Sequence, residues 1–181
     1  MEKIKIFECF AGYGTASFAL QKLKEENKLD YELIGFSEIN KWAIKCFQQN
    51  HGGTNYGSIT DIKWEEVPDF DLLTGGSPCQ DFSTAGLSKG LFNEDGSLTR
   101  SGLIFEFIRA IKDKKPKWVM WENVKGVLTK KHKDSFIMFL EEVCKLGYEV
   151  DFKLLNTKDY KIPQNRERIF AVFRRIDDGN R

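Results

Sequence analysis

Residues 75–86 read Gly-Gly-Ser-Pro-Cys-Gln-Asp-Phe-Ser-Thr-Ala-Gly and carry one cysteine, Cys79, at which we expect the chemistry of this protein. The segment follows the apolar run Phe70–Leu73, where a strand would end, and ligands bind at that edge of an open α/β sheet. Pro78 fixes its own backbone angle, and the flanking glycines let the chain pass close to a substrate. An isolated cysteine is more often a small buried side chain, so the other motifs decide between the two interpretations.

A glycine-containing turn, Phe10-Ala11-Gly12-Tyr13-Gly14, lies between an expected strand and an expected helix. Its glycines allow a tight turn and a close approach of the backbone to a ligand. Glu38 ends the next expected strand, 24 residues after Gly14, where a carboxylate suits the hydroxyl groups of a ribose. Thr15 and Ser17 interrupt the pattern that binds a pyrophosphate, so a nucleoside cofactor such as S-adenosylmethionine is favoured over NAD. A purely structural turn is the alternative.

The elements that position these groups alternate along the chain, which predicts an α/β fold with a mostly parallel sheet and helices on both faces. Strands are expected at Lys3–Phe10, Glu32–Ser37, Asp69–Thr74, Trp118–Trp121, 148–154 and Ile169–Phe173. Helices are expected at Thr15–Glu26, Lys41–Gln49, Leu103–Ile111 and Asp134–Lys145. Residues 84–100, rich in Gly, Ser and Asn, are expected to form a long loop.

Two of these helices have apolar patterns that predict one face each. The residues on these faces are Phe18, Ala19 and Leu23 in the first helix, and Phe136, Leu140, Val143 and Cys144 in the last. The three cysteines within apolar patterns are expected to be core thiols: Cys9, Cys46 and Cys144.

Length and composition fit one domain, because 181 residues with 41% hydrophobic side chains can form a substantial core. Residues 1–90 carry 9 Lys and Arg against 13 Asp and Glu, whereas residues 91–181 carry 19 against 14. This asymmetry suggests a half that faces a polyanion, and a solvated surface explains it equally well. No cysteine pairs or runs of 18 apolar residues occur, so we expect no metal site, no disulfide framework and no membrane segment.

Seven motifs in order over residues 4–174 resemble those of the C5-cytosine DNA methyltransferases. They are Phe10–Gly14, Glu38, Gly57-Ser-Ile-Thr60, Pro78-Cys79-Gln80, Arg100-Ser-Gly-Leu103, Glu122-Asn123-Val124 and Gln164-Asn-Arg166-Glu-Arg168. The resemblance implies a Rossmann-like class I methyltransferase fold, S-adenosylmethionine as cofactor and double-stranded DNA as substrate. It also implies base flipping, with the loop of residues 84–100 as a lid over the flipped cytosine.

The resemblance assigns a role to each motif residue. Cys79 would add to C6 of cytosine, and Glu122 would hold N3 with a carboxyl group that is protonated or becomes so in the transition state. Arg168 would orient Glu122 and contact the base O2, and Arg166 belongs to the same catalytic set. The expected cofactor-binding residues are Phe10, Gly12, Gly14, Glu38, Ser58, Ile59, Pro78 and Leu103. The expected substrate and loop contacts are Gln80, Ser83, Asn123 and Gln164.

The chain departs from the family pattern at three places, of which the mildest is Thr15 in place of a common glycine. Ser58 stands where the family usually has an aspartate beside the adenine amino group, and Asp61 could replace it only if the turn shifts. The sequence also ends at Arg181, without the target-recognition domain and the later motifs of the family, so residues 1–181 are expected to form one shortened catalytic domain. Such a domain is expected to expose an apolar face and, without a partner, to be poorly soluble or to self-associate.

Four alternatives to an independent DNA methyltransferase remain open from the sequence. The first alternative is the catalytic subunit of a split enzyme that a second polypeptide completes, and the second is an inactive remnant. The third is an RNA cytosine-5 methyltransferase, and the fourth is a docking module without catalysis. The presence of Cys79, Glu122 and Arg168 together argues against the docking module, which would not need these side chains. For every alternative, we expect a reducing cytoplasmic compartment, in a bacterium or a phage-infected host.

Overall fold

The computed structural model describes residues 3–77, 102–130 and 132–176. Its strands are β1 (Lys3–Cys9), β2 (Asp30–Ser37), β3 (Leu72–Gly75), β4 (Trp118–Val124), β5 (Tyr148–Asn156) and β6 (Glu167–Arg175). Its helices are α1 (Thr15–Glu25), α2 (Lys41–His51), α4 (Leu103–Lys114) and α5 (Lys133–Lys145). Three short 3₁₀ turns are η1 (Trp64–Glu66), η2 (Lys125–Leu128) and η3 (Thr157–Tyr160). Pro78, Cys79, Gln80, Ser83 and the expected loop of residues 84–100 lie outside the described residues.

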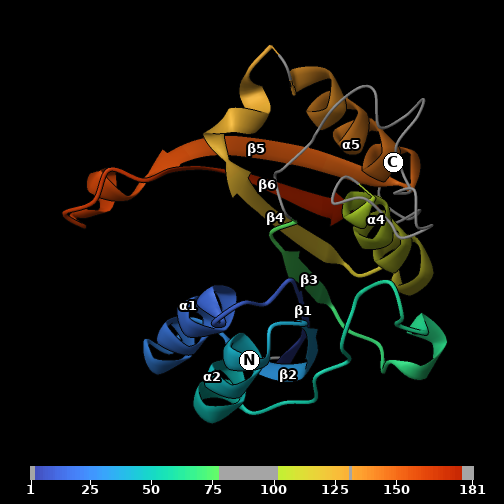
Figure 1. The fold of residues 1–181 in the computed structure, drawn as a ribbon, viewed down its shortest axis with the longest axis vertical. Coiled ribbons are helices and arrows are strands. Elements are labelled where there is room, and N and C mark those ends of the chain that lie inside the picture. Colours follow the sequence, from blue (N-terminus) through green and yellow to red (C-terminus); the bar gives the residue numbers. More distant parts are fainter. Residues whose placement is uncertain (1–2, 78–101, 131, 177–181) are drawn as a thin grey trace.

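The strands form one six-stranded sheet in the order β2-β1-β3-β4-β6-β5 (Figure 1). Neighbouring strands from β2 to β4 pair in parallel, and β6 runs antiparallel to both β4 and β5. Only residues 157–166 join β5 to β6, which is shorter than the dozen or so residues that a parallel crossover needs. The predicted α/β fold with a mostly parallel sheet is therefore confirmed, with one reversed strand.

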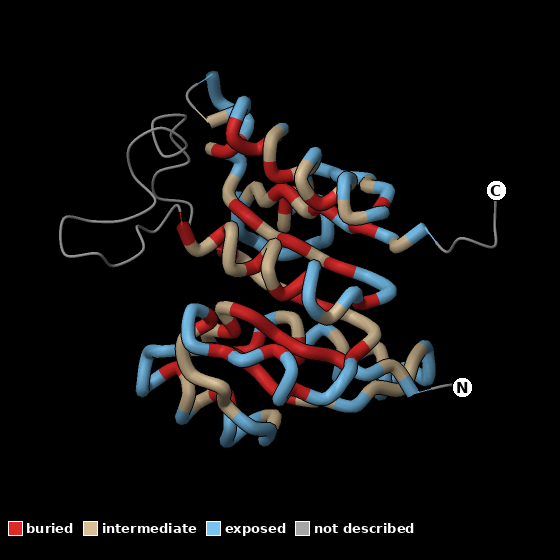
Figure 2. The backbone as a smooth tube through the Cα atoms, turned by 90° about the vertical axis from the view of Figure 1, so that its right-hand side faces the viewer, coloured by how far each residue is buried: buried red, intermediate tan, exposed pale blue. Residues whose placement is uncertain are grey.

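Helices cover both faces of the sheet, as predicted. Adjacent strand residues point to opposite faces, and in β1 the Cys9 side chain joins the core beneath α4 and α5 while Glu8 contacts α1. The larger core lies between the sheet, α4 and α5, where Trp121 packs against Phe139 with ring centroids 4.9 Å apart. Figure 2 shows the buried residues following the strands through the middle of the molecule.

Some predicted side-chain positions were wrong. In α1, Phe18 is 47% exposed and Ala19 is exposed, whereas Ser17 is fully buried because its hydroxyl donates to the buried Glu8. In α5, Phe136 and Val143 are buried and the half-buried Leu140 packs against the core, as predicted, and the fully buried Phe139 joins them without having been predicted. Of the three expected core thiols only Cys9 is buried, and Cys46 and Cys144 are half-buried.

The sheet face that carries Glu8 exposes two large apolar side chains toward β6 in the described part of the chain, beside charged residues such as Arg174 and Asp151. Residues opposite one another in paired strands share a face, and the register runs from Glu8 through Thr74 and Met120 to Val172. Val172 is 40% exposed, and Trp118 on the same face is 37% exposed. An apolar surface of this kind favours association with other apolar surfaces.

We therefore expect Val172→Lys to lower the tendency of the chain to self-associate, because a charge on this face must be desolvated when two copies meet. The measurement is sedimentation velocity over a range of protein concentrations. Ile137→Lys is the matched control, since Ile137 is also 40% exposed but lies on α5. An equal effect of the two substitutions would show that general surface charge, and not this face, governs association.

Candidate active site

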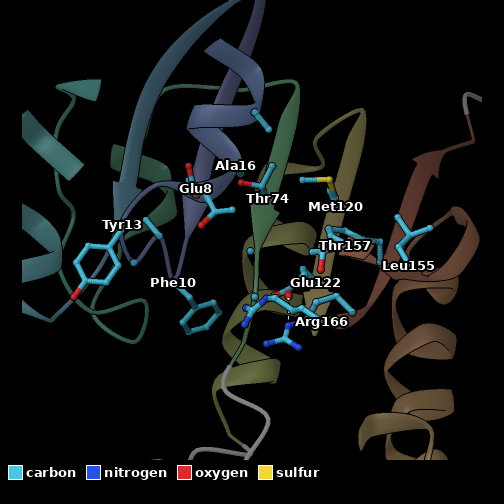
Figure 3. Close-up of a pocket in the computed structure, with 18 of the residues that line it drawn as sticks. Glu8, Phe10, Tyr13, Ala16, Thr74, Met120, Glu122, Leu155, Thr157 and Arg166 are labelled. Carbon is cyan, nitrogen blue, oxygen red and sulfur yellow. Dashed lines mark ion pairs between the residues drawn. The ribbon is translucent and has the colours of Figure 1, made fainter. Parts of the chain in front are cut away.

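A cavity of about 790 Å³ opens at the carboxyl ends of β1, β3 and β4 and extends over β6 and η3. The predicted site residues Phe10 and Gly12 line one part of it, and Glu122, Arg166 and Arg168 line another. Figure 3 shows Phe10 on one side of this cavity and Glu122 and Arg166 beside it, although these residues are far apart in the sequence. The sheet therefore brings the expected cofactor turn and the expected catalytic carboxyl into one site.

Glu122 and Arg168 form an ion pair across the antiparallel β4–β6 pair. The distance between Arg168 Nε and Glu122 Oε1 is 2.8 Å, and Arg168 Nη1 donates to the carbonyl of Glu167 at 2.8 Å. The arginine is thus anchored by its own backbone neighbour and fixes one oxygen of the carboxylate. The other oxygen, Oε2, lies only 3.0 Å from the position that a Cβ on Gly76 would occupy. A side chain at position 76 would therefore press on this carboxyl group and on the Glu122 carbonyl, 3.3 Å away, and would shift the carboxyl group slightly.

The chain that leaves β3 toward Cys79 is fixed by two side chains of β4. Trp121 Nε1 donates to Ser77 Oγ at 3.0 Å, and Asn123 Nδ2 donates to the Ser77 carbonyl at 2.9 Å. Asn123, expected among the substrate and loop contacts, therefore holds the backbone at Ser77. All of these groups are buried, so Ser77, the residue that precedes the Pro-Cys motif, is held in a defined position.

Glu38 is oriented by three backbone N–H groups. Its Oε2 accepts from Gly12 at 2.8 Å, and its Oε1 accepts from Ile39 and Asn40, both at 2.8 Å. A carboxylate has about four acceptor positions, so about one remains on Oε2 for a ribose hydroxyl. Gly12 has a φ of +54°, and no atom lies within 4 Å of the position that a Cβ would occupy, so space for a ligand remains beside this turn.

Other described residues that the sequence assigned to the site do not line the cavity: Gly14, Glu38, Ser58, Ile59, Leu103, Asn123 and Gln164. Gly14 has a φ of +85°, and a Cβ there would lie 2.6 Å from the His51 ring, so this glycine allows α1 and α2 to approach each other. The Ile59 side chain is 3% exposed within the core, and Leu103 packs against the same core. Gln164 is exposed, and its backbone carbonyl accepts from the Thr157 hydroxyl.

Glu8 is a site residue that the sequence interpretation missed. It lines the cavity but is only 4% exposed, and its carboxyl group accepts from the Ser17 hydroxyl at 2.6 Å and from the backbone N–H groups of Ala16 and Ser17. Gly14, the residue that precedes α1, supplies no side-chain cap, so Glu8 caps this helix from the neighbouring strand. An acidic residue between Phe7 and Cys9, inside an apolar strand, was the available signal.

Burial raises the pKa of Glu8 to about 7, against an ordinary value of 4.5. Between these two pH values the folded state keeps the Glu8 proton, whereas the unfolded chain releases it. The contribution of the protonated Glu8 to the free energy of unfolding is therefore complete below pH 4.5 and is lost as the pH rises through about 7. We expect Glu8→Gln to remove this dependence, so that between pH 5 and pH 8 the unaltered chain loses roughly 2.5 kcal/mol more stability than the variant.

Urea unfolding of both proteins at pH 5 and pH 8 measures this difference in the free energy of unfolding. The contributions of the groups that titrate in both proteins cancel in the comparison. Glu142→Gln is the control, because Glu142 forms an ordinary surface pair with Lys145 on α5. Parallel pH profiles for the unaltered chain and Glu8→Gln would contradict the assignment.

The described cysteines differ from what a nucleophile needs. Burial raises the pKa of Cys9 well above its usual value, so this thiol stays protonated although it lines the cavity. Burial also raises the pKa of Cys144, which lies on α5.

Among the described residues there is no group of three or more His, Cys, Asp or Glu that could hold a metal ion. No helix in the described part is long and apolar enough to cross a membrane.

Comparisons with known proteins agree with this geometry. The family model of the C-5 cytosine-specific DNA methylases matches residues 4–180. The orphan methyltransferase M.Rho11sI of Bacillus phage rho11s is 41% identical over 180 residues, which cover 98% of this chain and 34% of that protein. The type II methyltransferase M1.ScrFI of Lactococcus lactis subsp. cremoris is 39% identical over 170 residues, which cover 94% of this chain and 41% of that protein.

Solved structures share the fold. The Dnmt2 methyltransferase of S. pombe superposes with a TM-score of 0.73 at 19% identity, over 99% of this chain and 52% of that chain. The methyltransferase EhMeth of Entamoeba histolytica gives a TM-score of 0.73 at 20% identity, over 100% of this chain and 56% of that chain. The chain thus spans about a third to a half of the proteins it matches, and it belongs to the C-5 cytosine-specific DNA methylase family.

Proposed function

We propose that this chain is the catalytic domain of a DNA cytosine-5 methyltransferase that uses S-adenosylmethionine. The observation that carries the proposal is the Glu122–Arg168 pair, with its 2.8 Å contact, in the same cavity as the Phe10–Gly12 turn. A carboxyl group and a guanidinium side by side match the N3 and O2 edge of cytosine. The turn next to Glu38 suits a nucleoside, so the two reactants would meet in one cavity.

The residues beside this turn fit S-adenosylmethionine better than a dinucleotide. A pyrophosphate would need the free N–H groups at the start of α1, but Glu8 accepts from those of Ala16 and Ser17. Glu38, held by Gly12, keeps about one acceptor position for a ribose hydroxyl. When bound, the cofactor supplies an electrophilic methyl group on a sulfonium.

The chain's own residues would then act on the base. Cys79 adds its sulfur to C6 while the Glu122 carboxyl gives a proton to N3, so that the electron pair of the C5–C6 double bond becomes available at C5 for the methyl group. Arg168 keeps Glu122 oriented through Nε, and we assign its Nη2 as the donor to the base O2. Loss of the C5 proton to water then expels the Cys79 sulfur and restores the C5–C6 double bond, and N3 returns its proton to the Glu122 carboxylate. A free thiol is about 3% ionised at pH 7, so the site must favour the thiolate.

A second polypeptide that completes the enzyme is the other candidate, and the exposed apolar face around Trp118 and Val172 favours it. The chain spans 34% of M.Rho11sI and 41% of M1.ScrFI, so these relatives contain further residues, which a second polypeptide would supply in a split enzyme. The phage and bacterial origin of these relatives supports a cytoplasmic site of action in a bacterium or an infected host.

The test is transfer of a labelled methyl group from S-adenosylmethionine to duplex DNA of mixed sequence, with tRNA in parallel. We expect labelled 5-methylcytosine in the duplex. Label in tRNA alone would favour the RNA methyltransferase alternative, and label that appears only when the product of an adjoining reading frame is added would identify the split enzyme. Failure to bind S-adenosylmethionine, alone and with that product, would overturn the proposal.

A further inference from the structure

Strand β5 forms an open edge of the sheet. The strand order places β6 on one side of β5, and no strand of the described part of the chain lies on its other side (Figure 1). The opposite edge of the sheet differs, because Phe36 of β2 is bridged to Asn55 and its N–H donates to the Thr54 carbonyl at 3.0 Å. An open edge that is nine residues long is a template on which another strand can pair.

The hydrogen bonds at the two ends of the β5–β6 pair show which residues of β5 direct their backbone groups outward. Ile176 N–H donates to the Gly147 carbonyl at 2.8 Å, and Thr157 N–H donates to the Arg166 carbonyl at 3.1 Å. Residues of an antiparallel strand alternate between those that bond to the neighbouring strand and those that do not, so the odd-numbered residues of β5 bond to β6. The even-numbered residues turn their N–H and C=O groups to the open edge, and they include Val150, Phe152 and Leu154.

The side chains of these three residues form an apolar row on the face of the sheet that α5 covers. Phe152 is 49% exposed, although its ring meets the ring of Phe136 edge-on with centroids 5.6 Å apart. Leu154 is exposed and Val150 is half-buried. A strand that pairs with this edge would therefore gain backbone hydrogen bonds and cover apolar surface at the same time.

The charges of β5 match those of a second copy in one register. Two copies of a strand can pair antiparallel about a twofold axis, provided that outward-directed residues lie opposite one another. With the axis at Phe152, Val150 lies opposite Leu154 of the second copy, and Asp151 lies opposite Lys153 of the second copy. Asp151 and Lys153 bond to β6, so across the new pair they are not hydrogen-bonded through the backbone. Their Cα atoms would lie only about 4.5 Å apart, and their opposite charges would attract.

The other registers lack this match. An axis at Asp151 or at Lys153 sets that residue opposite its own copy, so that two like charges meet. An axis at Val150 sets Glu149 opposite Asp151, which are again like charges, and an axis at Leu154 brings no opposite charges together. Charges on an edge strand keep most strands away, and here they leave one favourable self-pairing.

We propose that β5 is a homodimer interface, at which β5 of a second copy of this chain pairs antiparallel about a twofold axis at Phe152. The residue pairs at and beside the axis would exchange both of their N–H···O=C hydrogen bonds, so that the two sheets continue into one another. The interface lies at the edge of the sheet and is separate from the cavity turn at Phe10–Gly12. It therefore holds whether or not the chain transfers methyl groups.

Phe152→Cys tests the position of the axis. Residues opposite one another in a hydrogen-bonded antiparallel pair have Cα atoms about 5.5 Å apart, a distance that a disulfide can span. Two copies of residue 150 would lie about 14 Å apart, which is four residues along a strand. Under mild oxidation we expect Phe152→Cys to give a covalent dimer on non-reducing gels, whereas Val150→Cys and the unaltered chain stay monomeric there. Equal cross-linking of the two variants would overturn the proposed register.

Reversal of the two charges tests the same register without a covalent bond. Asp151→Lys and Lys153→Asp each set like charges opposite one another on both sides of the axis, so we expect each to raise the dissociation constant of the dimer about tenfold. The double variant exchanges the two charges and should restore the affinity of the unaltered chain. Sedimentation velocity over a range of protein concentrations measures these constants, and the thermal unfolding midpoint shows that each variant is folded.

The controls are contained in this set of variants. The two single reversals change the net charge in opposite directions, so an effect of net charge alone would move their dissociation constants in opposite directions. A double variant that associates as weakly as the single variants would overturn the proposal. An unaltered chain that stays monomeric over the whole concentration range would also overturn it, and the proposed methyl transfer would be unaffected by either result.

Discussion

Glu122→Gln is expected to lower the rate of methyl transfer by about 10²- to 10⁴-fold, the usual contribution of a positioned proton donor. Glutamine has almost the same shape, and its Oε1 can still accept from Arg168 Nε, where the carboxylate contact is 2.8 Å. Its amide nitrogen would take the place of Oε2 and donate to N3 of cytosine. The variant can hold the base but cannot give N3 a proton as C6 is attacked.

This reasoning predicts a change in kcat with little change in KM, which single-turnover kinetics with labelled cofactor would measure. Glu142→Gln is the control for the loss of one carboxylate, because Glu142 pairs with Lys145 on the surface of α5. A large rise in KM with an unchanged kcat would mean that Glu122 contributes to binding alone. In that case the carboxyl group would not be the proton donor.

The contact between Gly12 and Glu38 could be predicted because it depends on where strands end. Gly12 and Glu38 lie at the ends of the first two strands, and the edge rule for open sheets places them together; the structure joins them by a 2.8 Å hydrogen bond. The Glu122–Arg168 contact was expected from the family resemblance and not from the strand pattern. It depends on the antiparallel pairing of β4 with β6, which sets Val124 opposite Arg168, and the sequence was interpreted without strand directions.

The buried face of α1 could not be predicted from apolar spacing. Periodicity assigns Phe18 and Ala19 to one side, but the side that packs on the sheet is chosen by a polar contact between Ser17 and Glu8. A buried carboxyl group needs hydrogen-bond donors, and the start of α1 supplies them, so this requirement outweighs the burial of one phenylalanine. A hydrophobicity pattern carries no information about such a pairing.

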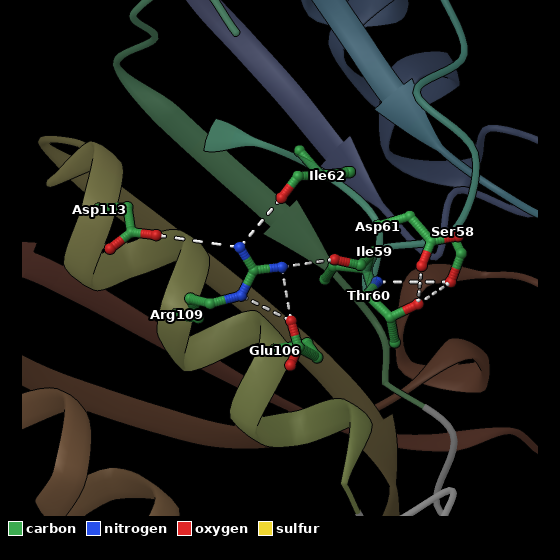
Figure 4. Close-up of polar contacts among 8 residues, drawn as sticks. All are labelled: Ser58, Ile59, Thr60, Asp61, Ile62, Glu106, Arg109 and Asp113. Atoms are coloured by element: carbon green, nitrogen blue, oxygen red, sulfur yellow. Dashed lines mark hydrogen bonds and ion pairs between the residues drawn. The ribbon is translucent and has the colours of Figure 1, made fainter. Parts of the chain in front are cut away.

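The role of Arg109 was also invisible in the sequence. The arginine belongs to a helix correctly predicted from its apolar spacing, on which a charged position is read as solvent-exposed. Its partners are the backbone carbonyls of Ile59 and Ile62, about 50 residues earlier in the chain (Figure 4). Every residue has a backbone carbonyl, so the residue type at these positions does not indicate such a contact. Contacts from side chains to distant backbone can be found only once the elements are placed in space.

Cys79→Ser is expected to reduce methyl transfer by about 10⁴-fold or more, because the substitution removes the proposed nucleophile. A thiol at pH 7 is about 3% ionised, whereas a serine hydroxyl is almost entirely protonated. Trp121 and Asn123 hold Ser77, and Cys79 follows two residues later, so the exchange of sulfur for oxygen leaves the anchoring contacts of the described chain intact. Cofactor binding and the urea midpoint should therefore stay close to those of the unaltered chain.

Cys46→Ser is the matched control, because Cys46 is a half-buried thiol on α2 that does not line the cavity. We expect this variant to retain the methyl-transfer rate. Cys9 is less suitable for this purpose, since a hydroxyl at that fully buried position would itself destabilise the core. Methyl transfer that survives Cys79→Ser in a folded, cofactor-binding chain would rule out a covalent adduct at Cys79. The activation of C5 would then have to come from the proton donor and the arginine alone.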